Sequence, residues 1–352
     1  MRPDQKPVTR RLHGDRITLA HGSGGKAMRD LIDQIFVESF DSAELRTLED
    51  QARFDLSTLA AHGDRLAITT DSYVIDPLFF PGGDIGKLAV SGTINDLAVG
   101  GAIPLYLSCA MIMEEGLPLE DLQRIVDSMK ATADAAGVRI VTGDTKVVHR
   151  GAADKLFINT TGIGIIPRGI EIGADRARPG DLILCNGYIG DHGAAVVDAR
   201  GELAMESTIE TDCVPLNGLI QVMLENCPDI HCMRDATRGG IATVLNEFAQ
   251  SSHCAMRIHE EALPVREQVR GMCEILGLDP LYLANEGKVI TVVAPAQAES
   301  LLDVMRAHPD GRHSAIIGEV IEQPAERVIL STRFGGDRIV DMLVGEQLPR
   351  IC

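Results

Sequence analysis

The stretch Val138-Arg139-Ile140-Val141-Thr142-Gly143-Asp144-Thr145-Lys146 joins an apolar segment to small polar residues, a carboxylate and a lysine. Its apolar part, 138–141, predicts a short strand. A helix is predicted just before it, over 119–136, because Pro118 suits a first helical turn and Gly137 suits a helix end. A second strand is predicted after it, over 155–165, where side chains alternate between two faces. Helices and strands in this order are typical of an α/β fold with mixed sheets.

The same mixture of elements continues towards the N-terminus. We predict a helix over 27–40, a strand over 65–69, a helix over 84–99 and a strand over 105–112. The helix at 84–99 carries many small residues, which allow another group to approach its backbone closely.

A break in the pattern near residue 170 predicts two domains. Residues 167–178 resemble a linker, and a new strand is predicted over 181–185 after the turn signal Pro179-Gly180. A chain of 352 residues is long enough for about two domains. We therefore divide the chain into an extension over 1–15, a first domain over 16–168, a second domain over 169–338 and a flexible tail over 339–352.

Composition and charge argue against several classes of protein. Lys and Arg number 33 against 51 Asp and Glu, a formal charge of −18. Nucleic-acid binders and membrane-surface proteins normally carry the opposite sign. No apolar run approaches the ~18 residues of a transmembrane helix, and the polar N-terminus lacks a signal-peptide core, so we expect a cytoplasmic protein. None of the eight cysteines forms a C-x-x-C pair, which predicts reduced thiols.

A glycine loop, His21-Gly22-Ser23-Gly24-Gly25-Lys26, precedes the helix predicted at 27–40. It is not a P-loop, because neither Ser nor Thr follows Lys26. It fits a dinucleotide-binding pattern formally, but no strand is predicted near Glu44, where that fold needs an acidic residue. Exposed backbone N–H groups and Lys26 could bind a phosphate. A tight turn before a helix is the structural alternative.

Four aspartates lie beside Gly, Thr or apolar residues at the expected ends or faces of elements: Asp71, Asp96, Asp144 and Asp235. A single aspartate after a strand is most often a helix cap. Several carboxylates that converge repel one another unless a cation lies between them. Mg²⁺ held by a few carboxylates and by substrate phosphates is the usual solution, and it would allow an acidic chain to hold ATP.

Two further charged residues have alternative roles. Glu286, in Asn285-Glu286-Gly287-Lys288 before a predicted strand, could be a solvated turn residue, a base or a group that orients phosphate. Lys146 could form a surface ion pair with Asp144 or stabilise phosphoryl transfer. His192 could be catalytic, but a histidine in a surface loop is the more common case and is expected here. His231-Cys232 matches no zinc spacing.

The sequence ends in Leu348-Pro349-Arg350-Ile351-Cys352. Prenylation needs a cysteine four residues from the end, so this motif does not fit. A thiol on a flexible arm suits a covalent carrier, because it can leave the surface, collect a group and return to an active site. An accidental terminal cysteine is the alternative.

Together these motifs resemble the HypE family of hydrogenase maturation factors, the carbamoyl dehydratases of the PurM-like (AIR synthetase-like) ATP-binding superfamily. The motifs at 21–26, 70–72, 95–96, 142–146, 235–240 and 285–288 occur in the family's order, and the terminal Pro-Arg-Ile-Cys is the most specific of them. The resemblance implies a PurM-like two-domain fold with an N-terminal AIR synthetase-like domain that binds ATP and dimerises. It also implies a C-terminal α/β domain and a mobile tail that ends in the carrier cysteine.

The resemblance further implies a reaction and its partners. A HypF-type carbamoyltransferase would load a carbamoyl group onto the terminal thiol, here Cys352. ATP-dependent dehydration would convert the thiocarboxamide to a thiocyanate. The cyano group would then pass to iron on a HypC–HypD-type scaffold complex, for a [NiFe]-hydrogenase centre. The family is expected to be homodimeric, with ATP in a cleft near the dimer interface.

Site residues follow from the resemblance, motif by motif. The expected ligands of Mg²⁺ are Asp71, Asp96, Asp144 and Asp235. Lys146 and Glu286 are the candidates for stabilising and deprotonating the amide, and Cys352 is the covalent carrier. The expected ATP-binding residues are Gly22, Ser23, Gly24, Gly25, Lys26, Asp71, Asn95, Asp96, Thr142, Gly143, Asp144 and Asp235.

Three other functions stay open at this stage. A PurM-like enzyme with a diffusible substrate, such as an amidine-forming or selenophosphate synthetase, would not need Cys352. A non-catalytic scaffold for maturation partners would need neither ATP nor the aspartates. A redox or metal carrier would use internal cysteines such as Cys227 and Cys232.

Overall fold

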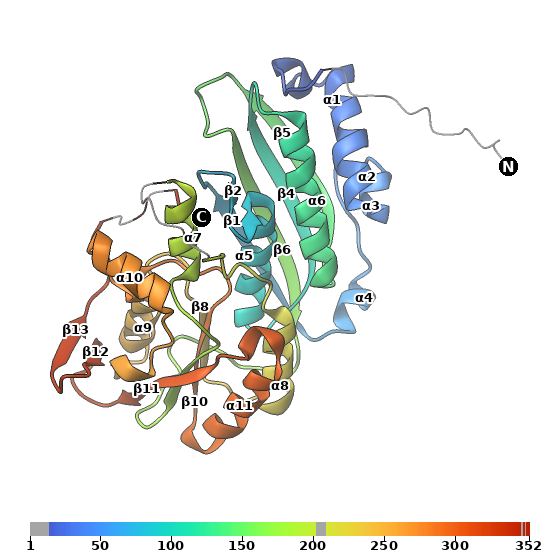
Figure 1. Ribbon diagram of the computed structural model, residues 1–352. Coiled ribbons are helices and arrows are strands. Elements are labelled where there is room, and N and C mark those ends of the chain that lie inside the picture. Colours follow the sequence, from blue (N-terminus) through green and yellow to red (C-terminus); the bar gives the residue numbers. More distant parts are fainter. Residues whose placement is uncertain (1–13, 202–208, 346–347, 349) are drawn as a thin grey trace.

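The computed structural model describes residues 14–201, 209–345, 348 and 350–352 and shows two sheets with helices packed against them (Figure 1). A four-stranded sheet has the order β1-β6-β4-β5, and a seven-stranded sheet has the order β13-β12-β9-β11-β7-β10-β8. The strands β2 and β3 form a separate two-stranded ribbon. The α/β fold with mixed sheets that the sequence predicts is confirmed.

The first sheet and its helices occupy the first half of the chain. The strands are β1 (Arg65–Tyr73), β2 (Phe79–Phe80), β3 (Gly83–Asp84), β4 (Ile103–Glu114), β5 (Arg139–Val148) and β6 (Leu156–Ile166). The helices are α1 (Lys26–Leu31), a π-helical turn (Ile32–Val37), α2 (Glu38–Phe40), α3 (Ala43–Arg46), α4 (Leu56–Ala60), α5 (Ile85–Val99) and α6 (Leu119–Ala135). The predicted helices at 84–99 and 119–136 and the strand at 155–165 are confirmed to within about a residue at each end.

Two strands extend further than the sequence predicts. β1 continues to Tyr73 rather than ending at residue 69, and β5 continues to Val148 rather than ending at residue 141. Asp71 and Asp144 therefore lie inside strands, not beyond them. The prediction was wrong because small polar residues were taken as strand ends, whereas a sheet with one face free of helices accepts them at alternate positions.

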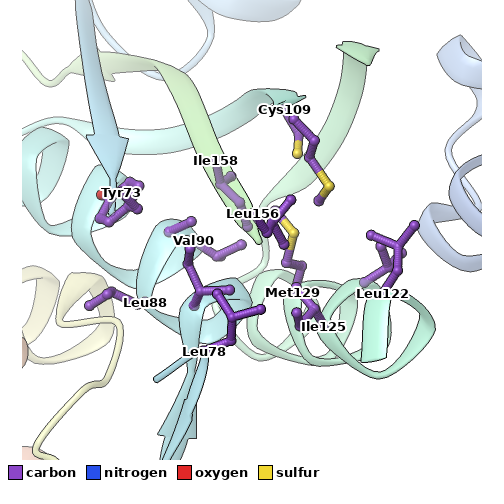
Figure 2. Packing of buried hydrophobic residues seen from close by; sticks show 14 of the residues in the cluster. Tyr73, Leu78, Leu88, Val90, Cys109, Leu122, Ile125, Met129, Leu156 and Ile158 are labelled. Carbon is purple, nitrogen blue, oxygen red and sulfur yellow. The ribbon is translucent and has the colours of Figure 1, made fainter. Parts of the chain in front are cut away.

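The two faces of the first sheet differ. α5 and α6 cover one face, and the core between them and the sheet is closely packed, as Figure 2 shows for residues such as Val90, Met129 and Ile158. The opposite face carries exposed apolar side chains, with Leu66 56 % and Ile68 64 % exposed. We call this uncovered face the outer face.

The second sheet occupies the second half of the chain. Its strands are β7 (Leu182–Cys185), β8 (Cys232–Asp235), β9 (Ala255–His259), β10 (Val289–Val293), β11 (Ala315–Ile321), β12 (Arg327–Ser331) and β13 (Asp337–Val340). The helices are α7 (Asp191–Ala199), α8 (Asn217–Asn226), α9 (Gly240–Ser251), α10 (Glu267–Leu276) and α11 (Pro295–Ala307). Only the β9–β12 pair is parallel among the pairings of this sheet.

His192 differs from its expected place in a surface loop. The glycine-rich stretch before it ends at Gly190, whose φ of 83° favours glycine, and α7 starts at the next residue. His192 therefore lies in the first turn of a helix and is fully buried.

The described part of the tail returns to the middle of the molecule. The C-terminus lies near α7 and β1 in Figure 1. Ile351 forms an isolated antiparallel bridge with Ile75, just beyond β1, and its side chain is buried. This docked position is not predicted from the sequence, and the mobility of the tail stays a prediction.

Candidate active site

The terminal cysteine meets a buried glutamate between the two halves of the molecule. The thiol of Cys352 is hydrogen-bonded to the side chain of Glu286, which is only 3 % exposed. A cavity of about 450 Å³ adjoins this contact and is lined by Ser72, Arg238, Tyr282 and the tail itself. The carrier and base candidates are therefore in contact within one chain.

Three of the four predicted aspartates also converge here. Asp71 comes from β1, Asp96 from α5 and Asp235 from the end of β8. Thr69 Oγ1 donates a hydrogen bond of 2.8 Å to Asp96 Oδ2, because Thr69 and Asp71 both face α5. We call Asp71, Asp96, Asp235, Arg238, Glu286 and Cys352 the tail site.

The carboxyl groups of the tail site outnumber its cations: Asp71, Asp96, Asp235 and Glu286 stand against Arg238. Burial, assisted by Asp212 and Asp235, raises the pKa of Glu286 well above its usual value. Burial and the neighbouring Asp96 raise the pKa of Asp235 to about 7. Burial also raises the pKa of Asp96, although the hydrogen bond from Thr69 opposes the shift. Carboxylates with raised pKa values in a cleft are typical of sites that bind a proton or a cation during function.

Arg238 is a cation of the tail site that motif analysis did not single out. Its Nη2 lies 4.0 Å from Asp71 Oδ1, and its side chain is 72 % exposed. It follows Asp235 in the loop before α9, so it can reach a ligand that enters from solvent.

The donor set fits Mg²⁺ only together with further ligands. No group of three or more His, Cys, Asp or Glu side chains in the described ranges could hold a metal ion alone. Mg²⁺ commonly takes one or two carboxylates and completes its shell with phosphate oxygens and water. Asp71, Asp96 and Asp235 offer such carboxylates close together, because, besides burial, Asp71 helps to raise the pKa of Asp96 and both help to raise that of Asp235.

The loop that carries Glu286 is held by Asp212. Asp212 Oδ1 accepts from the Glu286 backbone N–H at 3.0 Å, and Oδ2 accepts from that of Gly287 at 3.1 Å. Lys288 Nζ lies 3.0 Å from Asp212 Oδ2 in a pair that is almost completely buried. Burial alone would raise the pKa of Asp212, but the charge of Lys288 and the backbone hydrogen bond from Glu286 outweigh it, and the pKa lies below its usual value.

Asn95 joins α5 to the same loop. Its Nδ2 donates to the carbonyls of Val214 at 3.1 Å and Glu286 at 3.3 Å, and its Oδ1 accepts from Leu216 N–H at 2.7 Å. Asn95 is predicted from its motif to contact the nucleotide. Its amide is already engaged within the chain, so a positioning role for Glu286 follows more directly from the geometry.

The remaining predicted residues form a second group, away from the tail site. Asp144 Oδ2 lies 3.7 Å from Lys146 Nζ, and both side chains are more than half exposed. In the ladder Asp144 pairs with Ala110, while the buried Thr145 pairs with Met111, so Asp144 and Lys146 lie on the outer face. The four aspartates therefore do not converge within one chain, because Asp71 faces α5 and Asp144 faces away from it.

The glycine loop lies beside this second group. A Cβ atom at Gly22 would lie 2.8 Å from the backbone nitrogen of Val147, so the loop packs against the end of β5. We call Gly22–Lys26, Thr142, Gly143, Asp144 and Lys146 the β5 group. β5 and β1 are the two edge strands of the sheet. Three strand spacings of about 4.8 Å therefore separate the β5 group from Asp71.

Other candidate sites find no support in the described part of the chain. All cysteines except Cys352 are buried and free, which fits core packing rather than a redox or zinc site. His231 Nδ1 lies 2.7 Å from Asp181 in a buried pair, not beside other ligands. No helix that the structure describes is long and apolar enough to cross a membrane.

Both halves of the chain match known protein families. Residues 49–166 match the family model for the N-terminal domain of AIR synthase related proteins, and residues 178–331 match the model for the C-terminal domain. Carbamoyl dehydratase HypE of Rhodobacter capsulatus is 56 % identical over 341 residues, which cover 97 % of this chain and 99 % of that protein. Carbamoyl dehydratase HypE of Escherichia coli (strain K12) is 53 % identical over 338 residues, covering 96 % and 100 %.

Solved structures give the same result. A crystal structure of the hydrogenase maturation protein HypE in complex with ATP has a TM-score of 0.90 at 50 % identity, covering 95 % of this chain and 99 % of that one. A chain in a crystal structure of a HypE–HypF complex has a TM-score of 0.77 at 48 % identity, covering 89 % and 99 %. With two domain models in order and relatives above 50 % identity over nearly their whole length, this chain belongs to the HypE family of carbamoyl dehydratases within the AIR synthase related proteins.

Proposed function

We propose that this chain dehydrates a carbamoyl group carried on its own Cys352, using ATP, and so supplies the cyanide ligand of a [NiFe]-hydrogenase iron centre. The observation that carries the proposal is the contact of the Cys352 thiol with buried Glu286, which has Asp71 and Asp235 as charged neighbours. The sequence identity to HypE proteins, one of them solved with ATP, supports the reaction class and the cofactor.

The reaction needs a leaving group and a base. The oxygen of a thiocarboxamide leaves poorly, but transfer of the γ-phosphoryl group of ATP to it creates phosphate as the leaving group. Loss of the nitrogen protons and of phosphate then forms the C≡N bond, so that the thiocarboxamide and ATP yield the thiocyanate, ADP and phosphate. Glu286 is the candidate base, because a carboxylate with a raised pKa accepts a proton more readily near neutral pH.

Loading of the thiol belongs to another position of the tail. Burial, the negative charge of Glu286 and the hydrogen bond to it raise the pKa of docked Cys352, which keeps the thiol protonated and unreactive. The tail must therefore leave the tail site to receive a carbamoyl group. A HypF-type carbamoyltransferase is the proposed donor, supported by the HypE–HypF complex of a relative, and a HypC–HypD-type iron complex is the proposed acceptor.

Mg²⁺ and ATP are assigned to the two residue groups. Asp71, Asp96 and Asp235 would hold Mg²⁺, which would neutralise phosphate charge when bound. The β5 group would cover the phosphates, with Lys146 stabilising the transferred charge. Within one chain the β5 group cannot reach the tail site, so we infer that a second copy brings it there.

The outer face is the surface that such a homodimer would bury. Leu66, Ile68 and Ile112 are exposed there on β1 and β4, and Asp144 and Lys146 lie on the same face. Exposed apolar side chains gathered on one sheet face commonly mark an interface. A second copy packed on this face would cover them and complete the site.

The test is a mass measurement on the C-terminal fragment. Protein loaded by its carbamoyltransferase should carry one carbamoyl group on Cys352 and should lose one water from it only when Mg-ATP is added. Asp71→Asn should carry the load but fail to lose water, whereas a scaffold function predicts no difference. If ATP is consumed while Cys352 never gains mass, the chain acts on a diffusible substrate instead.

A further inference from the structure

Two side chains of the second domain hold the main chain of the docked tail. His192 Nε2 lies 2.8 Å from the carbonyl oxygen of Ile351, and Arg200 Nη2 donates to that of Arg350 at 2.8 Å. Both belong to α7, His192 in its first turn and Arg200 as its C-cap. Arg200 Nε also donates to the carbonyl of Asp76 at 2.9 Å, beside the strand end that the tail pairs with.

The His192 ring is fixed from three sides. The ring packs edge-to-face with Phe80 at a centroid distance of 5.5 Å, and Nδ1 lies 2.8 Å from Thr211 Oγ1. Burial lowers the pKa of His192, so the ring is neutral. A carbonyl oxygen only accepts, so Nε2 carries the proton, and Nδ1 accepts from the Thr211 hydroxyl.

A buried histidine often serves only the packing of a core, but this ring has a partner in the tail. When the tail leaves, the Nε2–H group loses its acceptor, and a buried donor without a partner is unfavourable. The surroundings of His192 are therefore complementary to the docked tail, because only the tail supplies the acceptor for Nε2–H. The ion pair of the Arg350 side chain with Asp154 is half-exposed and contributes little by comparison.

We propose that His192 and Arg200 form a latch that holds the tail by two consecutive backbone carbonyls and thereby sets the Cys352 thiol against Glu286. His192 is a positioning residue, since it touches the tail backbone one residue away from the thiol. The latch deepens the proposed carrier function. Docking of the tail by His192 and Arg200 does not depend on that function, whereas the expected effect on dehydration rests on it.

The latch has opposite effects on the two tasks of the tail. Cys352 must leave the tail site to be loaded and must return to it to be dehydrated. A weaker latch should therefore speed loading by the carbamoyltransferase and slow the loss of water from the loaded thiol. A merely structural role for His192 would slow both.

Alkylation of Cys352 measures docking without any reaction of the enzyme. The other seven cysteines are buried, so iodoacetamide modifies the full-length folded chain first at Cys352, which mass spectrometry of the C-terminal fragment quantifies. We expect His192→Leu to raise the alkylation rate about fivefold to tenfold, the effect of one lost hydrogen bond. His192→Gln, whose amide N–H can replace Nε2–H, should stay near the wild-type rate, and Arg200→Met should resemble His192→Leu.

Matched substitutions away from the tail serve as controls. His253→Leu removes an exposed histidine paired with Glu326, and Arg168→Met removes an exposed arginine paired with Asp64. Neither should change the alkylation rate.

Two outcomes would overturn the latch. One is a wild-type alkylation rate in both His192→Leu and Arg200→Met; if His192→Leu does not fold, Arg200→Met alone decides. The other is wild-type protein that reacts as fast as a free peptide ending in Arg-Ile-Cys, because the tail would then not be docked. Slow alkylation with no ATP-dependent loss of water would instead reject the proposed function and leave the latch intact.

Discussion

Removal of the Asp212 carboxylate should destabilise the loop that carries Glu286. Asp212 accepts hydrogen bonds from the backbone N–H groups of Glu286 and Gly287 and pairs with Lys288 Nζ at 3.0 Å. The Asp212 and Lys288 side chains are 4 % and 10 % exposed, so water cannot replace either partner. Asp212→Asn keeps the shape of the side chain and removes its charge.

The expected loss is large. Breaking one partner of a buried ion pair reduces the free energy of unfolding by about 3–5 kcal/mol. Lys288 would be left as a buried ammonium group without its counter-charge. Because the pKa of Asp212 is lowered in the folded state, its stabilisation is present above the unfolded-state pKa of about 3.9. It is lost as the pH falls through the lower folded-state pKa, so Asp212→Asn should also weaken the dependence of stability on acid pH.

Thermal and urea unfolding test this prediction, with Asp144→Asn as the control. The Asp144–Lys146 pair has 61 % and 65 % exposed side chains, so its loss should change stability by no more than about 1 kcal/mol. Adding Lys288→Met to Asp212→Asn should recover much of the loss, since the unpaired charge is then gone. An Asp212→Asn protein as stable as Asp144→Asn would show that the buried Asp212–Lys288 pair does not stabilise this loop.

Three further predictions concern the base, the acidic cluster and the outer face. Glu286→Gln should slow the loss of water from loaded Cys352 at least about 100-fold, because an amide cannot take up the proton. Alkylation of Cys352 should stay slow in this variant, and rapid loss of water would exclude Glu286 as the base. The pKa of Asp235 is raised to about 7 in the folded state, so between the unfolded-state pKa and pH 7 the folded chain keeps a proton that the unfolded chain has lost. The free energy of unfolding therefore falls as the pH rises towards 7. Asp235→Asn stays neutral and should therefore gain thermal stability relative to wild type at about pH 8 but not at about pH 4, and an equal difference at both would contradict the shift. Ile68→Glu should turn a dimer into a monomer in light scattering and abolish dehydration by removing the partner's β5 group, whereas a monomeric wild type that is fully active would exclude the dimer.

Much of the fold follows from local sequence patterns. The helix at 119–135 is recognisable because apolar residues recur at helical spacing between Pro118 and Gly137. The strand β6 is recognisable because its side chains alternate. Motifs also single out Asp71, Asp96, Asp235, Glu286 and Cys352, which the structure brings together.

The orientation of the aspartates could not be predicted, because it depends on strand length and register. Once β1 and β5 are seen to continue through Asp71 and Asp144, alternation places the two carboxylates on different faces. A one-residue difference in register reverses the face of every side chain. Sequence patterns predict that a strand exists better than they predict where it ends.

Asp212 was missed as a functional residue, and His192 was expected in a surface loop, for a related reason. Asp212 lies in an irregular segment, and its partners at 286–288 are more than 70 residues away in the sequence. His192 contacts Ile351, which is 159 residues away. Such contacts depend on the packing of the two domains and of the tail. The glycines before His192 indicated a loop, whereas Gly190 is the N-cap of α7 and the helix begins at the next residue.

In the proposed reaction, docked Cys352 carries the group that is dehydrated. Protein loaded with ¹³C-carbamoyl on Cys352 should, in a single turnover with Mg-ATP, develop a nitrile stretching band that shifts with the isotope and stays bound to the chain. Glu286→Gln loaded in the same way should not use ATP to form a nitrile and should show no such band. Consumption of ATP by the loaded wild-type protein with no protein-bound nitrile band would show that Cys352 does not carry the dehydrated group.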